Sequence, residues 1–138
     1  MSVLEICDPN PAAVPIGSTV EQAIRVMLSE SVGAVAVVDS EGIVAGIFTE
    51  RDILEKLALS GRNPAEVPIR EVMTTPVEMA TDETSEAEAL TVMMVRHYRH
   101  LPVVDARGKL LGMLSIRHVL QAQLEDLARQ LNAAKTAG

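Results

Sequence analysis

The sequence predicts an α/β fold of the α+β type: two β-α-β-β-α repeats packed sheet to sheet about a pseudo-two-fold axis. The first observation is an internal repeat, because residues 23–54 align with residues 89–120 at a constant offset of 66. The second is that each copy alternates short apolar runs with amphipathic stretches. The third is that one copy alone cannot cover both faces of its small sheet. Identical pairs include Ala23/Ala89, Val37/Val103, Asp39/Asp105, Gly46/Gly112 and Arg51/Arg117.

Capping residues and turn residues divide each copy into elements. Thr19 with Gln22 forms a capping-box pattern that should begin a helix, and Gly33 should end it. Asp52 favours a second helix start after Thr49, where the helix dipole stabilises negative charge. In the first copy we expect an extended lead-in 1–17, a helix from 19, strands 34–38 and 43–48, and a helix 49–59. Between the copies we expect a helical turn 69–73, and in the second copy strand 77–80, helix 85–97, strands 101–104 and 109–114, and a helix from 115 to about 133.

The chain accordingly divides into three predicted segments. Residues 1–60 form the first repeat with its lead-in, residues 61–76 a linker, and residues 77–138 the second repeat with an extended C-terminal helix. That last helix is expected to exceed its counterpart by about two turns. It carries a leucine stripe with 4-3-4 spacing, formed by Leu120, Leu124, Leu127 and Leu131. Packing on its own repeat and contact with a partner helix both fit this stripe.

The composition argues against several classes of function. A net charge of −7 and a pI near 4.9 disfavour binding to nucleic acid or to an anionic membrane. No apolar run approaches the ~20 residues of a membrane span, and the chain does not open with a signal-peptide pattern. Cys7 is the only cysteine, which excludes an internal disulfide and suits a cytoplasmic location.

Two stretches are specific enough to indicate a family. They are Gly46-Ile47-Phe48-Thr49-Glu50-Arg51-Asp52, and Tyr98-Arg99-His100-Leu101-Pro102-Val103-Val104-Asp105 followed by Gly108, Gly112 and Ser115-Ile116-Arg117. With Met73-Thr74 before the second copy, the pattern resembles the tandem cystathionine-β-synthase (CBS) domain pair, or Bateman module, over roughly residues 12–125. The resemblance implies two clefts related by the pseudo-two-fold axis, and a homodimer. It also implies a regulatory ligand such as AMP, ADP, ATP, S-adenosylmethionine or NAD.

The first implied cleft contains the motif G-h-x-[TS]-x-x-D, with Ile47 as its apolar residue, Thr49 as its hydroxyl and Asp52 as its carboxylate. In the family this hydroxyl and carboxylate hold ribose or phosphate, and a carboxylate can accept from both ribose hydroxyls. From the residues alone, Thr49 as a helix cap and Asp52 as its dipole partner is the simpler role, and the two roles are compatible. The other residues assigned to this cleft are Tyr98, Arg99, His100, Arg51 and Arg117, of which the last four are candidate phosphate partners.

The second implied cleft departs from the motif. Ser115 keeps the hydroxyl, but His118 stands where the carboxylate is expected. An imidazole cannot make the bidentate contact of a carboxylate to a diol. The opposite strand start, Val32-Gly33-Ala34, carries no cation. The sequence therefore predicts tighter nucleotide binding in the cleft of Asp52 than in the cleft of His118.

These residues favour a regulatory module over an enzyme. His97, His100 and His118 match no metal-site spacing, and no nucleophile–base arrangement stands out, so we expect no metal, no catalysis and no cofactor. The predicted function is binding of an adenosine-containing nucleotide between the repeats and signalling to a separate protein. The alternative is a ligand-free dimerisation module. The two differ in whether four side chains converge: Thr49, Asp52, Arg99 and His100.

Overall fold

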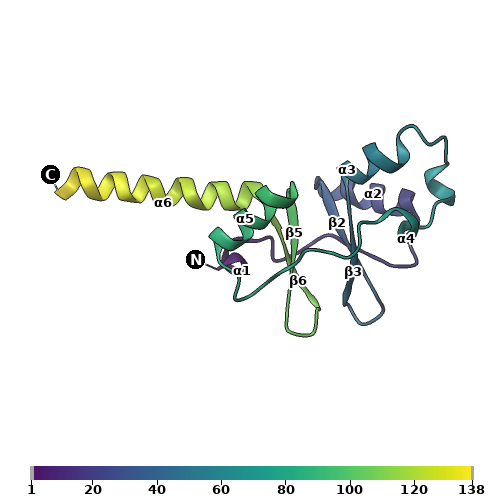
Figure 1. The fold of residues 1–138 in the computed structure, drawn as a ribbon, viewed down its shortest axis with the longest axis horizontal. Coiled ribbons are helices and arrows are strands. Elements are labelled where there is room, and N and C mark those ends of the chain that lie inside the picture. The colour runs from purple at the N-terminus through teal and green to yellow at the C-terminus, as the bar shows by residue number, and fades with distance from the viewer. Residues whose placement is uncertain (1, 138) are drawn as a thin grey trace.

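The computed structural model describes residues 2–137 and contains two three-stranded sheets flanked by helices (Figure 1). The strands are β1 (Ala13–Pro15), β2 (Ala34–Val38) and β3 (Val44–Thr49) in the first sheet, and β4 (Ala80–Thr81), β5 (His100–Val104) and β6 (Leu110–Ser115) in the second. In each sheet the first strand is parallel to the middle strand and the third is antiparallel to it. The predicted mixed α/β fold of two similar halves is therefore confirmed.

The helical elements follow the same 66-residue offset. They are α1 (Val3–Ile6), α2 (Val20–Glu30), α3 (Glu50–Asp52) with the π-helical turn η1 (Ile53–Leu57), the 3₁₀ turn η2 (Pro64–Glu66), α4 (Ile69–Val72), α5 (Glu86–Arg96) and α6 (Ile116–Ala137). The bounds of α1, α2, β2 and β3 become those of α4, α5, β5 and β6 when 66 is added. The halves diverge after their third strands, because α3 and η1 end at Leu57 whereas α6 continues as a long helix projecting from the body (Figure 1).

The caps of α2 explain where this helix begins and ends. Thr19 and Gln22 form the expected capping box, with the Thr19 N–H donating to Gln22 Oε1 over 2.8 Å. The helix ends at Ser31 and not at Gly33 as predicted. Ser31 adopts the left-handed region (φ +55°), and the following N–H of Val32 donates to the Met27 carbonyl, which closes the last turn.

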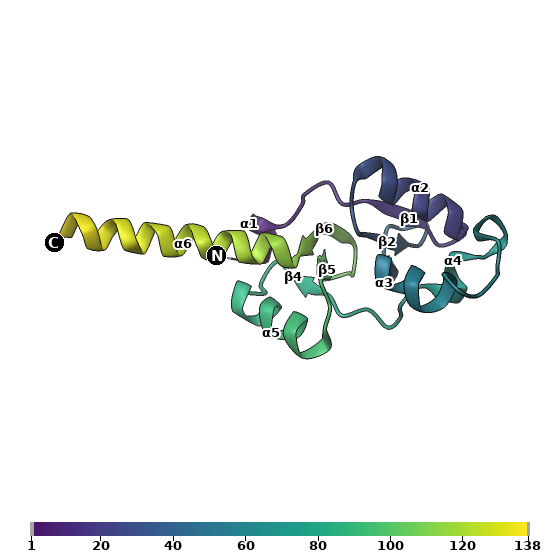
Figure 2. The same cartoon turned by 90° about the horizontal axis from the view of Figure 1, so that it is seen from above.

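The two short helices α1 and α4 each pack on the repeat that they do not precede in the sequence. α1 precedes the first repeat, but Val3 and Cys7 lie in the core of the second repeat. α4 precedes the second repeat, but Ile69 and Val72 lie in the core of the first repeat. Figure 2 shows α1 beside α6 and α4 near α2, at opposite ends of the body. The prediction that the lead-in is extended throughout is thus wrong for residues 3–6, which form a helix that packs its fully buried Val3 side chain into the second core.

Two other predicted bounds change. The predicted linker, residues 61–76, supplies buried Val67 as well as α4 to the first core. The predicted strand 77–80 pairs with β5 only at Ala80 and Thr81, and Val77 instead packs between the sheets.

The sheets pack against each other through small and apolar side chains. Ala34, Ala36, Ile47 and Met113 are buried there. Backbone hydrogen bonds also join the two hairpins, since the Val44 N–H donates to the Gly108 carbonyl over 3.0 Å. This arrangement confirms the predicted sheet-to-sheet packing and leaves the starts of α3 and α6 on either side of one cleft.

Candidate functional site

One continuous cleft of about 1140 Å³ lies between the repeats. Every residue predicted for the two separate clefts lines it: Val32, Gly33, Ala34, Ile47, Thr49, Arg51, Asp52, Tyr98, Arg99, His100, Ser115, Arg117 and His118. We call the part around Thr49 and Asp52 the Asp52 half, and the part around Ser115 and His118 the His118 half. The Arg51 guanidinium donates to the carbonyl of His97 over 3.1 Å, so the start of α3 reaches the end of α5 across the cleft.

In the Asp52 half the carboxylate is satisfied from within the chain. Its Oδ2 accepts from the Thr49 N–H at 2.9 Å and lies 3.3 Å from the Thr49 hydroxyl. Its Oδ1 accepts from the Thr74 hydroxyl at 2.8 Å and lies 2.8 Å from Lys56 Nζ. The Asp52 side chain is 5 % exposed. Because a carboxylate offers about four lone-pair sites, little capacity is left for a ligand.

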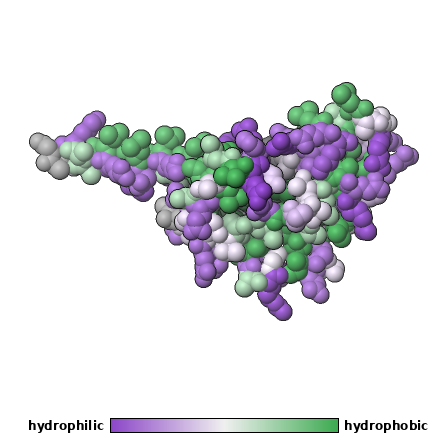
Figure 3. All heavy atoms as spheres, in the orientation of Figure 1, coloured by the Kyte–Doolittle hydropathy of each residue, from purple (hydrophilic) through white to green (hydrophobic). Residues whose placement is uncertain are grey.

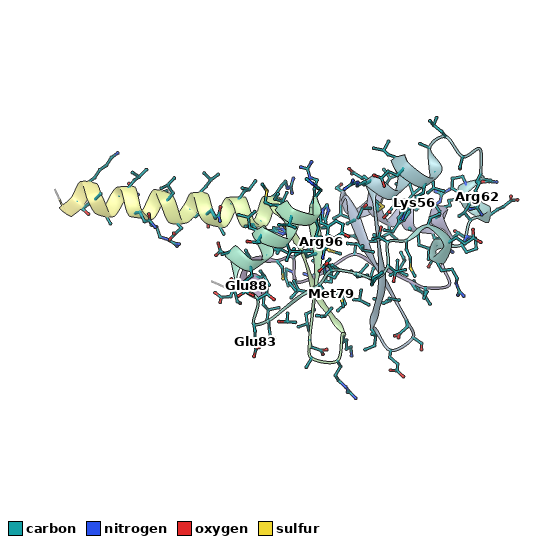
Figure 4. The ribbon with its side chains drawn as sticks, viewed as in Figure 1. Lys56, Arg62, Met79, Glu83, Glu88 and Arg96 are labelled. Atoms are coloured by element: carbon teal, nitrogen blue, oxygen red, sulfur yellow. The ribbon has the colours of Figure 1, made fainter. Side chains whose placement is uncertain are left out.

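Sequence reasoning did not assign Lys56 or Thr74 to the site. Lys56, labelled in Figure 4 on the helical turn of the first repeat, also donates to the Val72 carbonyl over 2.8 Å. The sequence feature that could have identified Lys56 is its position four residues after Asp52, which is the spacing of a helical ion pair. Thr74 is held on β3 by two backbone hydrogen bonds with Ile47, and it lies two residues after the end of α4.

In the His118 half an imidazole replaces the carboxylate in the same capping geometry. The Ser115 N–H donates to His118 Nδ1 over 2.9 Å, and the His118 N–H donates to Ser115 Oγ over 3.4 Å. An accepting Nδ1 leaves the proton of the neutral ring on Nε2. Burial lowers the pKa of His118, nearby Asp8 raises it, and Arg117 lowers it further.

Asp8 is a further cleft residue that the sequence prediction missed. Its N–H donates to the Met113 carbonyl over 2.9 Å, and its carbonyl accepts from the Met113 N–H at 3.1 Å. These are the counterparts of the two hydrogen bonds between Thr74 and Ile47. Asp8 therefore occupies in the His118 half the position that Thr74 occupies in the Asp52 half. The offset of 66 between positions 8 and 74 is the sequence feature that could have identified Asp8 as the counterpart of Thr74.

The sequence model of the CBS domain matches residues 3–59 and again residues 69–125. The chain belongs to the CBS domain family. Both matches include the short helix that packs on the opposite repeat.

Relatives of this CBS pair include archaeal proteins. An uncharacterised 17.7 kDa protein of Acidianus ambivalens is 37 % identical over 123 residues, which are 89 % of this chain and 73 % of that protein. The protein MK0525 of Methanopyrus kandleri is 34 % identical over 110 residues, which are 78 % of this chain. This chain covers 56 % of that relative, a little over half its length.

Solved structures of CBS proteins have the same fold. The CBS-domain containing protein ATU1752 of Agrobacterium tumefaciens matches with a TM-score of 0.80 at 28 % identity, over 89 % of this chain and 99 % of that one. The CBSX2 protein of Arabidopsis thaliana in complex with AMP matches with a TM-score of 0.76 at 26 % identity. That match covers 90 % of this chain and 96 % of CBSX2.

His100 adds no positive charge to the cleft of this CBS pair, whose lining holds five Lys or Arg side chains and five Asp or Glu side chains. Burial, Arg99, His118 and Arg117, in that order of effect, together lower the pKa of His100 to about 4. His100 is therefore neutral at pH 7, not a cation, and can only donate or accept a hydrogen bond there. Arg99 and Arg117 carry the charge that favours an anion.

Other chemistry has little support among the described residues. Within residues 2–137, no group of three or more His, Cys, Asp or Glu side chains is placed to hold a metal ion. Over the same residues, no helix is both long enough and apolar enough to cross a membrane. Arg96, labelled in Figure 4 at the end of α5, forms an ion pair with Glu78 at 3.3 Å.

Proposed function

We propose that this CBS pair is a non-catalytic regulatory module that binds an adenosine-containing nucleotide, of the AMP, ADP or ATP type, between its repeats. Binding would be passed to a separate regulated protein, and the setting would be the cytoplasm. The observation that carries the proposal is the single cleft in which Arg51, Arg99 and Arg117 line the same space as the hydroxyls of Thr49 and Ser115. Guanidinium groups suit phosphates, and hydroxyls suit a ribose. The AMP complex of CBSX2 adds support from a protein of the same fold.

A ligand panel tests the proposal. The full chain is titrated with AMP, ADP, ATP, NAD and S-adenosylmethionine, using calorimetry and thermal unfolding. A ligand at ~100 times its Kd adds roughly 2.7 kcal/mol to the free energy of unfolding, which is a clear rise in Tm for a chain of this size. If none of the five ligands binds, the nucleotide proposal is wrong.

We also propose that the module is a homodimer. Several large apolar side chains are exposed, and two pairs of them are related by the offset of 66: Leu28 with Met94, and Leu54 with Leu120. Figure 3 shows a further hydrophobic strip along the projecting part of α6, where Leu124, Leu127 and Leu131 are more than half exposed. Covering such surfaces with a second copy removes apolar area from water. Light scattering on the purified chain should give the mass of two chains.

A ligand-free dimerisation module is the second candidate. The observation that favours it is the satisfied carboxylate of Asp52, whose oxygens already contact Thr49, Thr74 and Lys56. A dimer that binds no member of the ligand panel would support this candidate. A dimer that binds one of them would support the nucleotide module.

A further inference from the structure

The two halves of the cleft each contain one carboxylate, but at different positions. In the Asp52 half the acid lies on α3 and the facing position, after α4, is Thr74. In the His118 half the residue on α6 is an imidazole and the facing position, after α1, is Asp8. The backbone hydrogen bonds of Asp8 to Met113 and of Thr74 to Ile47 match, so the exchange is one of side chains and not of geometry.

The two carboxylates differ in what they can still accept. Asp52 already contacts three side chains, including the ammonium of Lys56 at 2.8 Å. In the His118 half the position corresponding to Lys56 is Ala122, which has no charge to offer. Among residues 2–137, the Asp8 carboxylate accepts one hydrogen bond, from the Asn10 N–H to Oδ1 at 2.9 Å. Its Oδ2 accepts no hydrogen bond from the described residues, and Asp8 is a half-buried residue that lines the cleft.

His118 supplies the complementary donor. Its Nδ1 is occupied by the Ser115 N–H, so its neutral ring presents Nε2–H, which has no partner among the described residues. A carboxylate that accepts and an imidazole N–H that donates are the two groups needed by a vicinal diol. One diol hydroxyl can donate to Asp8 Oδ2 while a hydroxyl oxygen accepts from His118 Nε2–H.

We propose that Asp8 and His118 form a ribose-diol subsite and that the nucleoside is held in the His118 half. This inference rests on the proposed nucleotide binding, and it reverses the order of affinity that the sequence predicts for the two halves. The phosphates would then lie toward Arg99 and Arg117 around the half-buried ring of His100.

The decisive variant is Asp8→Asn, which keeps an oxygen for the Asn10 N–H but loses the charge. AMP and 2′-deoxy-AMP are titrated calorimetrically into the wild-type chain and the variant. A charge-assisted hydrogen bond to a ligand contributes enough that Asp8→Asn should weaken AMP binding about ten- to a hundredfold. Removing the 2′-hydroxyl should weaken binding to the wild type by a similar factor. It should weaken binding to Asp8→Asn only slightly further, because the two changes remove the same contact.

Two control variants complete the experiment. Asp39→Asn changes another aspartate whose Oδ1 holds a turn, at 2.9 Å from the Glu41 N–H, outside the cleft, and it should bind AMP like the wild type. Asp52→Asn should retain AMP affinity within about threefold if the ribose lies in the His118 half.

The outcomes separate this inference from the proposed function. A wild-type chain that binds none of the panel refutes both. A wild-type chain that binds AMP, with unchanged affinity in Asp8→Asn, refutes the subsite alone. If Asp52→Asn does not fold, the comparison of Asp8→Asn with 2′-deoxy-AMP decides alone. Non-additive losses of affinity support the subsite, and additive losses refute it.

Discussion

The two repeats differ at the start of the helix that follows their third strand. The first repeat has the Asp52–Lys56 ion pair there, and the second has His118 and Ala122 at the corresponding positions. Both repeats nevertheless have the same capping hydrogen bonds at the start of the helix, made to a carboxylate in one and to an imidazole in the other. The start of this helix therefore needs an acceptor for a backbone N–H, and either a carboxylate or an imidazole can supply it. The remaining chemistry of each half is free to differ, and with it the ligand that each half can hold.

The largest expected difference between the repeats concerns Gly46 and Gly112. Gly46 lies against the segment that follows α4, and Gly112 lies against the segment that follows α1. A Cβ at Gly112 would lie 2.5 Å from Cys7 Sγ and 2.8 Å from the backbone oxygen of Asp8, whereas a Cβ at Gly46 would meet only the flexible side chain of Met73. We expect Gly112→Ala to lower the free energy of unfolding by about 3 kcal/mol and Gly46→Ala by about 1 kcal/mol. Urea unfolding of both variants measures which one loses more free energy of unfolding. Equal losses would show that the segments after α1 and α4 adapt equally well to an added methyl group.

Removing Lys56 should have the next largest effect. In Lys56→Met the Asp52 carboxylate keeps Thr49 and Thr74 but loses its cation. Breaking a buried ion pair is costly, but the Lys56 side chain is 37 % exposed, so we expect a loss of about 1–2 kcal/mol. The matched variant is Ala122→Met at the corresponding position of the second repeat, which removes no charge. AMP affinity should not fall in Lys56→Met, and a large fall would place the ligand in the Asp52 half.

The pH dependence of stability should depend on His100. Its pKa falls from 6.5 to about 4 on folding, so the unfolded chain takes up a proton at a higher pH than the folded chain does. The stability held above pH 6.5 is therefore lost as the pH falls toward 4, by about 1–2 kcal/mol between pH 7 and pH 5. The groups that face the ring are Glu50, Arg99, Arg117 and His118.

The variant His100→Gln isolates this contribution. Urea unfolding at pH 5, 6 and 7 should show a shallower loss for His100→Gln than for the wild type. An NMR titration of the wild-type ring that gives a pKa near 6.5 would contradict the burial argument. Bound phosphate near Arg99 and Arg117 should raise the pKa of His100, because it offsets their charge.

Much of this architecture follows from local patterns in the sequence. The capping box at Thr19 and the apolar run of β2 were sufficient to place their elements. The exchange of α1 and α4 was not predictable, because a four-residue helix has too few positions to show a periodic face and its choice of repeat depends on tertiary packing. For the same reason Asp8 was missed, since its role depends on where α1 docks.

The sequence indicated which residue types line the cleft but not the hydrogen bonding or the charge of their side chains. All the assigned side chains line the cleft, but the sequence did not reveal that Lys56 satisfies Asp52 or that burial keeps His100 neutral. Both depend on distances between side chains that no spacing rule specifies.

The smallest expected effect on monomer stability concerns the end of α6, where the halves differ most in length. Leu127 and Leu131 lie on the projecting part of this helix and are 51 % and 56 % exposed, so the double change Leu127→Glu with Leu131→Glu should alter the stability of one chain by less than about 0.5 kcal/mol. If the stripe is a partner surface, the same change should reduce the light-scattering mass from two chains to one, because two charges would then be buried without partners. Gln130→Glu adds a charge beside the stripe without removing a leucine and should leave the dimer intact. A double variant that still has the mass of two chains would move the interface to the body, where Leu28 and Leu54 are exposed, and would leave the long helix free for the regulated protein.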